Sequence, residues 1–177
     1  YAVLSGPEGV RHSFNAEVSQ KDLWETYLPA FEKAVKVGHV EAVMGAYNRT
    51  NGEPCCGSKT LLQDILRDKW NFAGHVVSDC GAIADFHLHH KVTETAEESA
   101  AMAVRNGSDL NCGHTYPSLL AAIGEGLLDE KDIDIACTRL FETRMKLGMF
   151  DPAEDMPYAN IPYEMNDRPE HHQLSLE

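Results

Sequence analysis

The stretch His75-Val76-Val77-Ser78-Asp79-Cys80-Gly81 decides how this chain of 177 residues is organised. Its β-branched apolar pair, Val76-Val77, predicts a buried strand that runs through serine into the carboxylate of Asp79. The glycine that follows the cysteine favours a turn at that point. In parallel α/β folds, active sites lie at the carboxyl ends of the strands. Asp79 is therefore the first candidate for a catalytic residue.

The spacing of the predicted strands suggests a repeated unit. A strand is expected at 40–47, where the residues are apolar on both faces as in parallel sheets, and another at 108–111. The strand ends at Tyr47, Asp79 and Asn111 are then 32 residues apart each time (79 − 47 and 111 − 79). Each interval holds a loop, a helix and a turn, which is the size of a βα unit.

The predicted fold class is α/β, as a fragment rather than a complete domain. Residues 1–6 are predicted to form the end of a fourth strand. The chain would then supply roughly the last three to four βα units of a TIM-like (β/α)8 barrel. A complete doubly wound sheet is the alternative. Four strands cannot close a barrel, and their two open edges invite pairing with a second copy or with missing strands.

Capping residues mark the helices between these strands. Ser19, followed by Asp22, predicts a helix start, and Pro29 predicts the first residue of a second helical piece. Ser58 predicts the start of a helix that continues to Lys69. Further helices are expected at 95–106, 119–126 and 129–147, and the start of another at 170–177; loops are expected at 8–18 and 48–57, and a loop or short helix at 82–93.

Composition argues against two classes of partner and indicates how the chain divides into domains. The chain carries 15 basic and 28 acidic residues, a net charge of −13, which argues against nucleic acid or an anionic membrane as a partner. No apolar run approaches the roughly 18 residues of a membrane span. We expect a domain portion at 1–150, and a proline-rich linker with the start of a next domain at 151–177.

The five cysteines fit no zinc ribbon or CxxC site. Cys80 and Cys112 each follow a predicted strand end by one residue, on strands that should be neighbours about 4.8 Å apart. Disulfides need Cα separations of about 4.4–6.8 Å, so a Cys80–Cys112 bridge beside Asp79 is feasible. Two nearby reduced thiols are the alternative, because the compartment is unknown.

Six motifs in order give the chain a family resemblance. They are GAYNR at 45–49, NGEP at 51–54, LLQDILR at 61–67, VVSD at 76–79, SDLNCG at 108–113 and LGMFD at 147–151. Each is weak alone, but together they resemble glycoside hydrolase family 3 over nearly the whole chain. The serine-aspartate-cysteine form at Asp79, with Cys112, is most similar to the β-xylosidase branch.

The resemblance implies roles for three residues. The family's first domain is a TIM-like barrel, and its nucleophile is the aspartate of the Ser-Asp motif, here Asp79, in a retaining mechanism with a covalent glycosyl-enzyme. A tyrosine in the position of Tyr47 lines the sugar subsite, with a core tyrosine as the alternative. An arginine in the loop of Arg11 contacts sugar hydroxyls, with a solvated arginine as the alternative. Metal binding is not assigned: a loop cluster at His87, His89 and His90 is more typical of a solvated rim.

The resemblance also implies a substrate and missing parts. We expect a β-xylosidase that releases terminal xylose from xylo-oligosaccharides, with a β-glucosidase as the alternative, and a periplasmic or secreted location. No cofactor is expected. The family's sugar-binding Lys-His pair would precede Tyr1, and its general acid/base comes from a second domain. The isolated chain is therefore expected to be inactive, and an inert structural or carbohydrate-binding unit is a further alternative.

Overall fold

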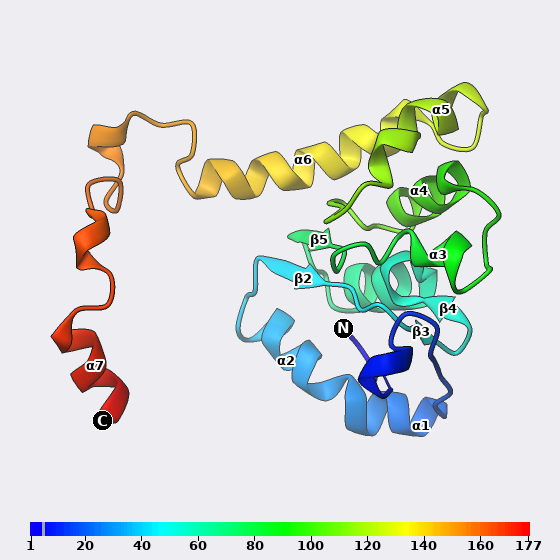
Figure 1. Ribbon diagram of the computed structural model, residues 1–177, viewed down its shortest axis with the longest axis horizontal. Helices are drawn as coiled ribbons and strands as arrows, with labels where there is room; N and C mark the ends of the chain where they lie inside the picture. The colour runs from blue at the N-terminus through cyan, green and yellow to red at the C-terminus, as the bar shows by residue number, and fades with distance from the viewer. Residues whose placement is uncertain (5) are drawn as a thin grey trace. The chain divides into compact units, whose positions relative to one another are not determined.

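The computed structural model describes residues 1–4 and 6–177 and divides them into two compact units, Tyr1–Thr143 and Arg144–Glu177 (Figure 1). The first unit contains all the strands assigned in the described residues. The candidate site residues lie in this unit; they are Arg11, Tyr47, Asp79, Cys80 and Cys112.

Two short parallel strands form the ladder that leads to Asp79. β2 (Ala42–Met44) pairs with β5 (His75–Val77), and every residue of β2 lies opposite the residue 33 positions later. Val77 then forms a parallel bridge to Leu110, again 33 residues away (110 − 77). A mixed α/β class is thus confirmed.

The expected spacing of 32 residues was wrong by one. β2 and β5 end at Met44 and Val77, before Tyr47 and Asp79, and these observed ends are 33 residues apart (77 − 44). Residues 1–4 belong to no ladder, and Ser5, within the expected fourth strand, lies outside the described residues. The burial expected on both faces of 40–47 was also wrong: Ala42 and Met44, on one face of β2, are both exposed, Met44 to 54%.

A second small sheet lies where the sequence predicts loops, at 8–18 and 48–57. It contains β1 (Asn15–Ala16), β3 (Arg49–Thr50) and β4 (Glu53–Pro54) in the order β1-β3-β4. β3 and β4 form a hairpin around Asn51-Gly52, whose φ angles are 49° and 90°. Both positive angles are typical of a two-residue hairpin turn, for which Asn-Gly is the strongest sequence signal. Strands of two residues are too short for an apolar alternation to reveal them.

The capping predictions were confirmed. Ser19 accepts a hydrogen bond from the backbone of Asp22 at the start of α1 (Gln20–Asp22). Pro29 is the first residue of α2 (Pro29–Lys36). Ser58 accepts from the backbone of Leu61 at the start of η4 (Lys59–Lys69), an eleven-residue segment with π-helical hydrogen bonding.

The remaining helices agree with the expected positions within a few residues. They are α3 (Asp85–Leu88), α4 (Ala96–Arg105), α5 (Leu119–Gly124), α6 (Glu130–Lys146) and α7 (Pro169–Leu176). Shorter helical segments are η1 (Glu8–Val10), η2 (Leu23–Tyr27), η3 (Cys55–Gly57), η5 (Tyr116–Ser118), η6 (Ala153–Asp155) and η7 (Tyr163–Met165). Where 151–169 was expected to be an extended linker, η6 and η7 add single turns between prolines. None of the helices in the described residues has the length and apolar content that crossing a bilayer requires.

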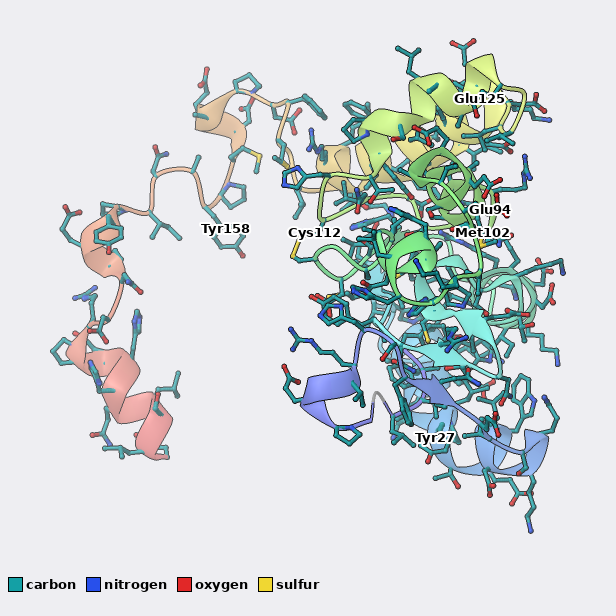
Figure 2. All side chains as sticks on the ribbon, turned by 45° about the vertical axis from the view of Figure 1, so that its right-hand side comes forward. Tyr27, Glu94, Met102, Cys112, Glu125 and Tyr158 are labelled. Carbon is teal, nitrogen blue, oxygen red and sulfur yellow. A yellow bond between two sulfur atoms is a disulfide. The ribbon has the colours of Figure 1, made fainter. Side chains whose placement is uncertain are left out.

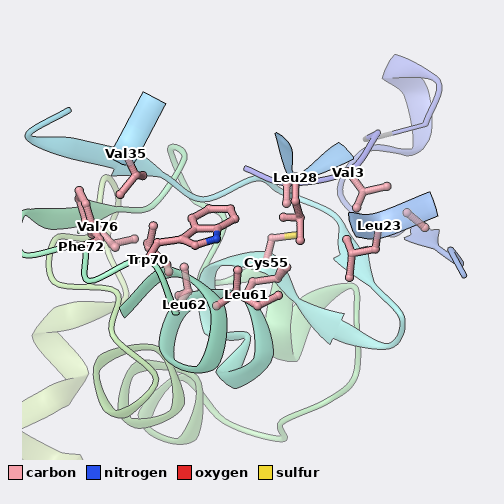
Figure 3. Packing of buried hydrophobic residues seen from close by; sticks show 14 residues of the cluster. Val3, Leu23, Leu28, Val35, Cys55, Leu61, Leu62, Trp70, Phe72 and Val76 are labelled. Carbon is pink, nitrogen blue, oxygen red and sulfur yellow. The ribbon is translucent and has the colours of Figure 1, made fainter. Parts of the chain in front are cut away.

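The main core packs η4 against the ladder and the amino-terminal helices (Figure 3). Its largest buried side chains include Leu61, Leu62 and Leu66 of η4, with Val76 of β5 fully buried beside them. Burying each such side chain contributes about 1.5–3 kcal/mol. A smaller cluster of Ala82, Ile83, Phe86, Cys56 and Ala103 lies beneath the turn that follows Asp79.

A buried ion cluster of Asp109, Arg67 and Arg139 stabilises the ladder next to this core. Asp109 Oδ2 accepts hydrogen bonds from the backbone of Val76 at 2.8 Å and from Arg67 Nη2 at 2.9 Å. Asp109 Oδ1 accepts from Arg139 Nη1 at 2.9 Å. The Asp109 side chain therefore accepts the hydrogen bond from the backbone of Val76. The strand expected at 108–111 is reduced to the single bridge at Leu110.

Candidate active site

Asp79 lies two residues beyond β5, at the carboxyl edge of the parallel ladder. The preceding Ser78 is buried, and its backbone N–H donates to the carbonyl of Leu110 at 2.8 Å. Asp79 Oδ1 accepts from the backbone N–H of Cys80 at 2.8 Å, which orients the half-buried carboxylate. Gly81 then turns the chain with φ at 80°. The carboxylate is thus held by a short loop anchored on both sides, as a nucleophile requires.

Tyr47 lies beside this carboxylate. Its hydroxyl donates to the carbonyl of Cys80 at 2.9 Å. Partial burial and then the negative charge of Asp79 raise the pKa of the Tyr47 hydroxyl, so it remains a neutral donor at pH 7. The structure therefore brings Tyr47 and Asp79 together.

Arg11 belongs to the same cluster through the tyrosine ring. Its guanidinium carbon lies 4.9 Å from the ring centroid of Tyr47, a cation–π contact, and it forms an ion pair with Glu8. His12 packs on the same ring with centroids 4.4 Å apart. The loop of Arg11 and the loop of Tyr47 thus meet beside Asp79, although 36 residues separate them in sequence (47 − 11).

A disulfide joins Cys80 to Cys112 next to Asp79, with Cα atoms 4.4 Å apart (Figure 2). Two hydrogen bonds reinforce the link: the backbone of Cys112 donates to Ser78 Oγ at 3.0 Å, and the backbone of Gly81 donates to the Cys112 carbonyl at 2.6 Å. Cys55 and Cys56 are buried free thiols, where burial raises the pKa of Cys56 to about 12 and keeps it protonated.

We expect replacement of both bridged cysteines by serine to destabilise the chain by about 4 kcal/mol. The bridge closes a separation of 32 residues, and a loop of that length restricts the unfolded chain by roughly this amount. Urea unfolding of the oxidised protein measures the loss, and a reducing agent should abolish the difference between variant and parent. Thiol counting in denaturant is the check: three reactive thiols of five are expected, and five would show that the bridge is absent.

The three neighbouring histidines of α3 and its end have three different environments. His87 Nδ1 lies 2.9 Å from Ser99 Oγ, and His89 Nδ1 lies 2.6 Å from Asp85 Oδ1. His90 is 5% exposed and stacks on Phe86, and burial lowers its pKa to about 4. The expectation of a solvated rim was therefore wrong for His90, because its position after the helix end turns its ring into the core.

Sequence reasoning missed a second cluster beside Tyr47. Asp85 is 3% exposed, and its two carboxylate oxygens contact His12 Nδ1 at 2.8 Å and His89 Nδ1 at 2.6 Å. In the described residues, these three form the group whose potential metal-ligand atoms all lie within 4.8 Å of one another. The i,i+4 spacing of Asp85 and His89 is a visible signal, but His12 is far away in sequence and gave none.

The family follows from comparison with known proteins. Residues 5–143 match the family model described as the glycosyl hydrolase family 3 N terminal domain. The chain belongs to glycosyl hydrolase family 3. The matched residues cover most of the first compact unit and include Asp79, Tyr47 and Arg11.

Similar curated proteins are named xylosidases. The chain is 48% identical to a xylan 1,4-beta-xylosidase of Xylanibacter ruminicola over 92% of its own length and 19% of that protein. It is 49% identical to a probable exo-1,4-beta-xylosidase of Neosartorya fischeri over 90% of its length and 21% of that protein. The chain thus spans about a fifth of the length of these relatives.

Solved structures of the family are similar in fold. A GH3 exo-beta-xylosidase in complex with a xylobiose aziridine activity-based probe superposes with a TM-score of 0.86 at 31% identity, over 93% of this chain and 22% of that chain. A beta-glucosidase from Listeria innocua in complex with isofagomine gives a TM-score of 0.77 at 31% identity, over 90% and 21% of the two chains.

Proposed function

We propose that this chain is the nucleophile-bearing part of a retaining exo-β-xylosidase that releases terminal xylose from xylo-oligosaccharides. The observation that carries the proposal is the identity of 48–49% to proteins named xylosidases over about nine-tenths of the chain. The position of Asp79 at the carboxyl end of β5 supports the chemistry.

Asp79 is proposed as the nucleophile. Its carboxylate oxygen forms a bond to the anomeric carbon while the bond from that carbon to the leaving oxygen breaks, and water later hydrolyses the glycosyl-enzyme. The neutral Tyr47 hydroxyl and the Arg11 guanidinium bind sugar hydroxyls on one side of this carboxylate. The general acid that protonates the leaving oxygen comes from a part of the enzyme outside these 177 residues.

The finer fold and the partners of the chain are part of the proposal. Residues 1–150 are taken as the carboxyl-terminal portion of a TIM-like barrel, and 151–177 as the linker and start of the next domain. An apolar hollow of about 330 Å³ beside β2 supports a missing neighbour; its lining includes Val43, Met44 and Trp70. The remaining strands of such a barrel and its second domain are the expected occupants, and a second copy of the chain is the alternative.

A chimeric enzyme tests the function. We would replace the matching segment of the Xylanibacter ruminicola xylosidase with this chain and measure kcat/KM on aryl β-xyloside and aryl β-glucoside. Preference for the xyloside supports the proposal, and preference for the glucoside supports the β-glucosidase alternative. The same junctions carrying the Neosartorya fischeri segment provide the matched control. If that control is active and the chimera folds but hydrolyses neither substrate, the chain is an inert unit.

A further inference from the structure

The cluster of His12, Asp85 and His89 has an arrangement that the proposed glycosidase chemistry does not use. His12 comes from the loop after η1, whereas Asp85 is the first residue of α3 and His89 directly follows its last. The i,i+4 spacing puts the latter two side chains on one face of the helix. Both histidine rings direct Nδ1 at the same carboxylate, at 2.8 Å and 2.6 Å.

We propose that His12, Asp85 and His89 bind a divalent transition-metal ion, with Zn²⁺ as the best fit. Zinc is bound by imidazole nitrogen and carboxylate oxygen, and three protein ligands with an open fourth position suit it. The ligand atoms lie within 4.8 Å of one another, so small side-chain rotations enclose an ion at about 2.0–2.2 Å from each. His12 and His89 are partly exposed, which leaves water access to the fourth position.

Charge supports a cation at this place. The side chain of Asp85 is 4% exposed, and both of its ion pairs among the described residues are with histidines, which carry charge only when protonated. Asp109, the comparably buried aspartate, is paired instead with Arg67 and Arg139, which are permanently charged. Burying a carboxylate without a permanent cation is costly, and a divalent ion supplies the missing positive charge.

Arg11 competes with metal binding and so provides a sharp test. Its Nε donates to His12 Nε2 at 3.3 Å, which fixes the hydrogen of the neutral ring on Nδ1. A metal on Nδ1 requires the hydrogen to move to Nε2, where it would face the donor of Arg11. Loss of the Arg11 donor should therefore strengthen metal binding. Because the His12 ring also packs on Tyr47, the ion would link the loop of Arg11 to α3 beside the candidate sugar site.

The direct measurement is calorimetric titration of Zn²⁺ into the EDTA-treated chain at neutral pH, independent of any enzyme activity. We expect one ion per chain. His12→Ala, Asp85→Asn and His89→Ala should each weaken binding by about 10-fold or more, and Arg11→Ala should tighten it. His89 is half exposed, so His89→Ala keeps the test valid if Asp85→Asn does not fold.

Two matched controls separate this cluster from other histidines and thiols. His87→Ala removes a histidine of the same helix that contacts Ser99, and His172→Ala removes one that pairs with Asp167 in the second unit. Both should leave Zn²⁺ affinity unchanged. Co²⁺ absorption reports the ligand type, and a thiolate charge-transfer band would assign the ion to exposed Cys137 and overturn the proposal. Absence of stoichiometric binding, or its loss in His172→Ala but not in His89→Ala, would also overturn it.

Discussion

Asp79→Asn is expected to lower kcat of the active chimeric enzyme on aryl β-xyloside by on the order of 10³-fold or more. The amide keeps the shape of the carboxylate but cannot attack the anomeric carbon, so the covalent intermediate does not form. The effect should fall on kcat more than on KM, because the substitution leaves Tyr47 and Arg11, the proposed sugar-binding residues, unchanged. Steady-state kinetics and circular dichroism of the same samples measure the rate and the fold.

Azide rescue distinguishes a nucleophile from a merely structural aspartate. In Asp79→Gly, added azide can enter the vacated space and attack the anomeric carbon of an activated xyloside. The new bond is carbon to nitrogen, the aryl oxygen leaves, and the xylosyl azide has inverted configuration. Asp64→Asn, at an exposed aspartate of η4, should retain the parent rate. Near-normal turnover in Asp79→Asn would show that the assignment is wrong.

Asp109→Ala is expected to have the largest effect on stability, a loss of about 3–5 kcal/mol. The change leaves Arg67 and Arg139 without their buried partner and removes the acceptor for the backbone of Val76. Burial and the charge of Arg139 already lower the pKa of Arg67 to about 10, so the two cations are close enough to repel when the carboxylate is gone. Because native domains have about 5–15 kcal/mol in total, such a loss can unfold the chain. Urea unfolding followed by circular dichroism measures it.

Milder variants keep this prediction measurable. Arg139→Met removes one of two cations from the more exposed side of the cluster and should cost less than Asp109→Ala. Asp64→Asn, which breaks an exposed ion pair with Lys59, should leave the free energy of unfolding unchanged within error. Equal small losses in all three variants would contradict a structural role for the buried cluster.

Local signals predicted most of the helices. Ser19, Ser58 and Thr95 each accept a backbone hydrogen bond at a helix start, and the proline at 29 begins α2. These interactions involve residues three apart, so the sequence alone contains both partners. The buried strand before Asp79 was also visible, because Val76-Val77 is a local β-branched apolar pair.

Contacts between segments that are distant in sequence were harder to predict. The Asn51-Gly52 pair is a local signal for its hairpin, whereas the register of 33 residues is set by pairing between strands that are distant in sequence. The reduction of 108–111 to one bridge followed from Asp109, whose side chain bonds to Val76 across 33 residues. No local pattern encodes such a contact.

The sequence by itself determined the family, the helix starts and the position of Asp79 after a buried strand, because each depends on neighbouring residues and their order. Only the tertiary structure decided that Arg11 and His12 pack on Tyr47, and that His12 and His89 share the buried carboxylate of Asp85. The physical reason is that loop closure and burial bring these groups together, and both depend on the packing of the whole first unit.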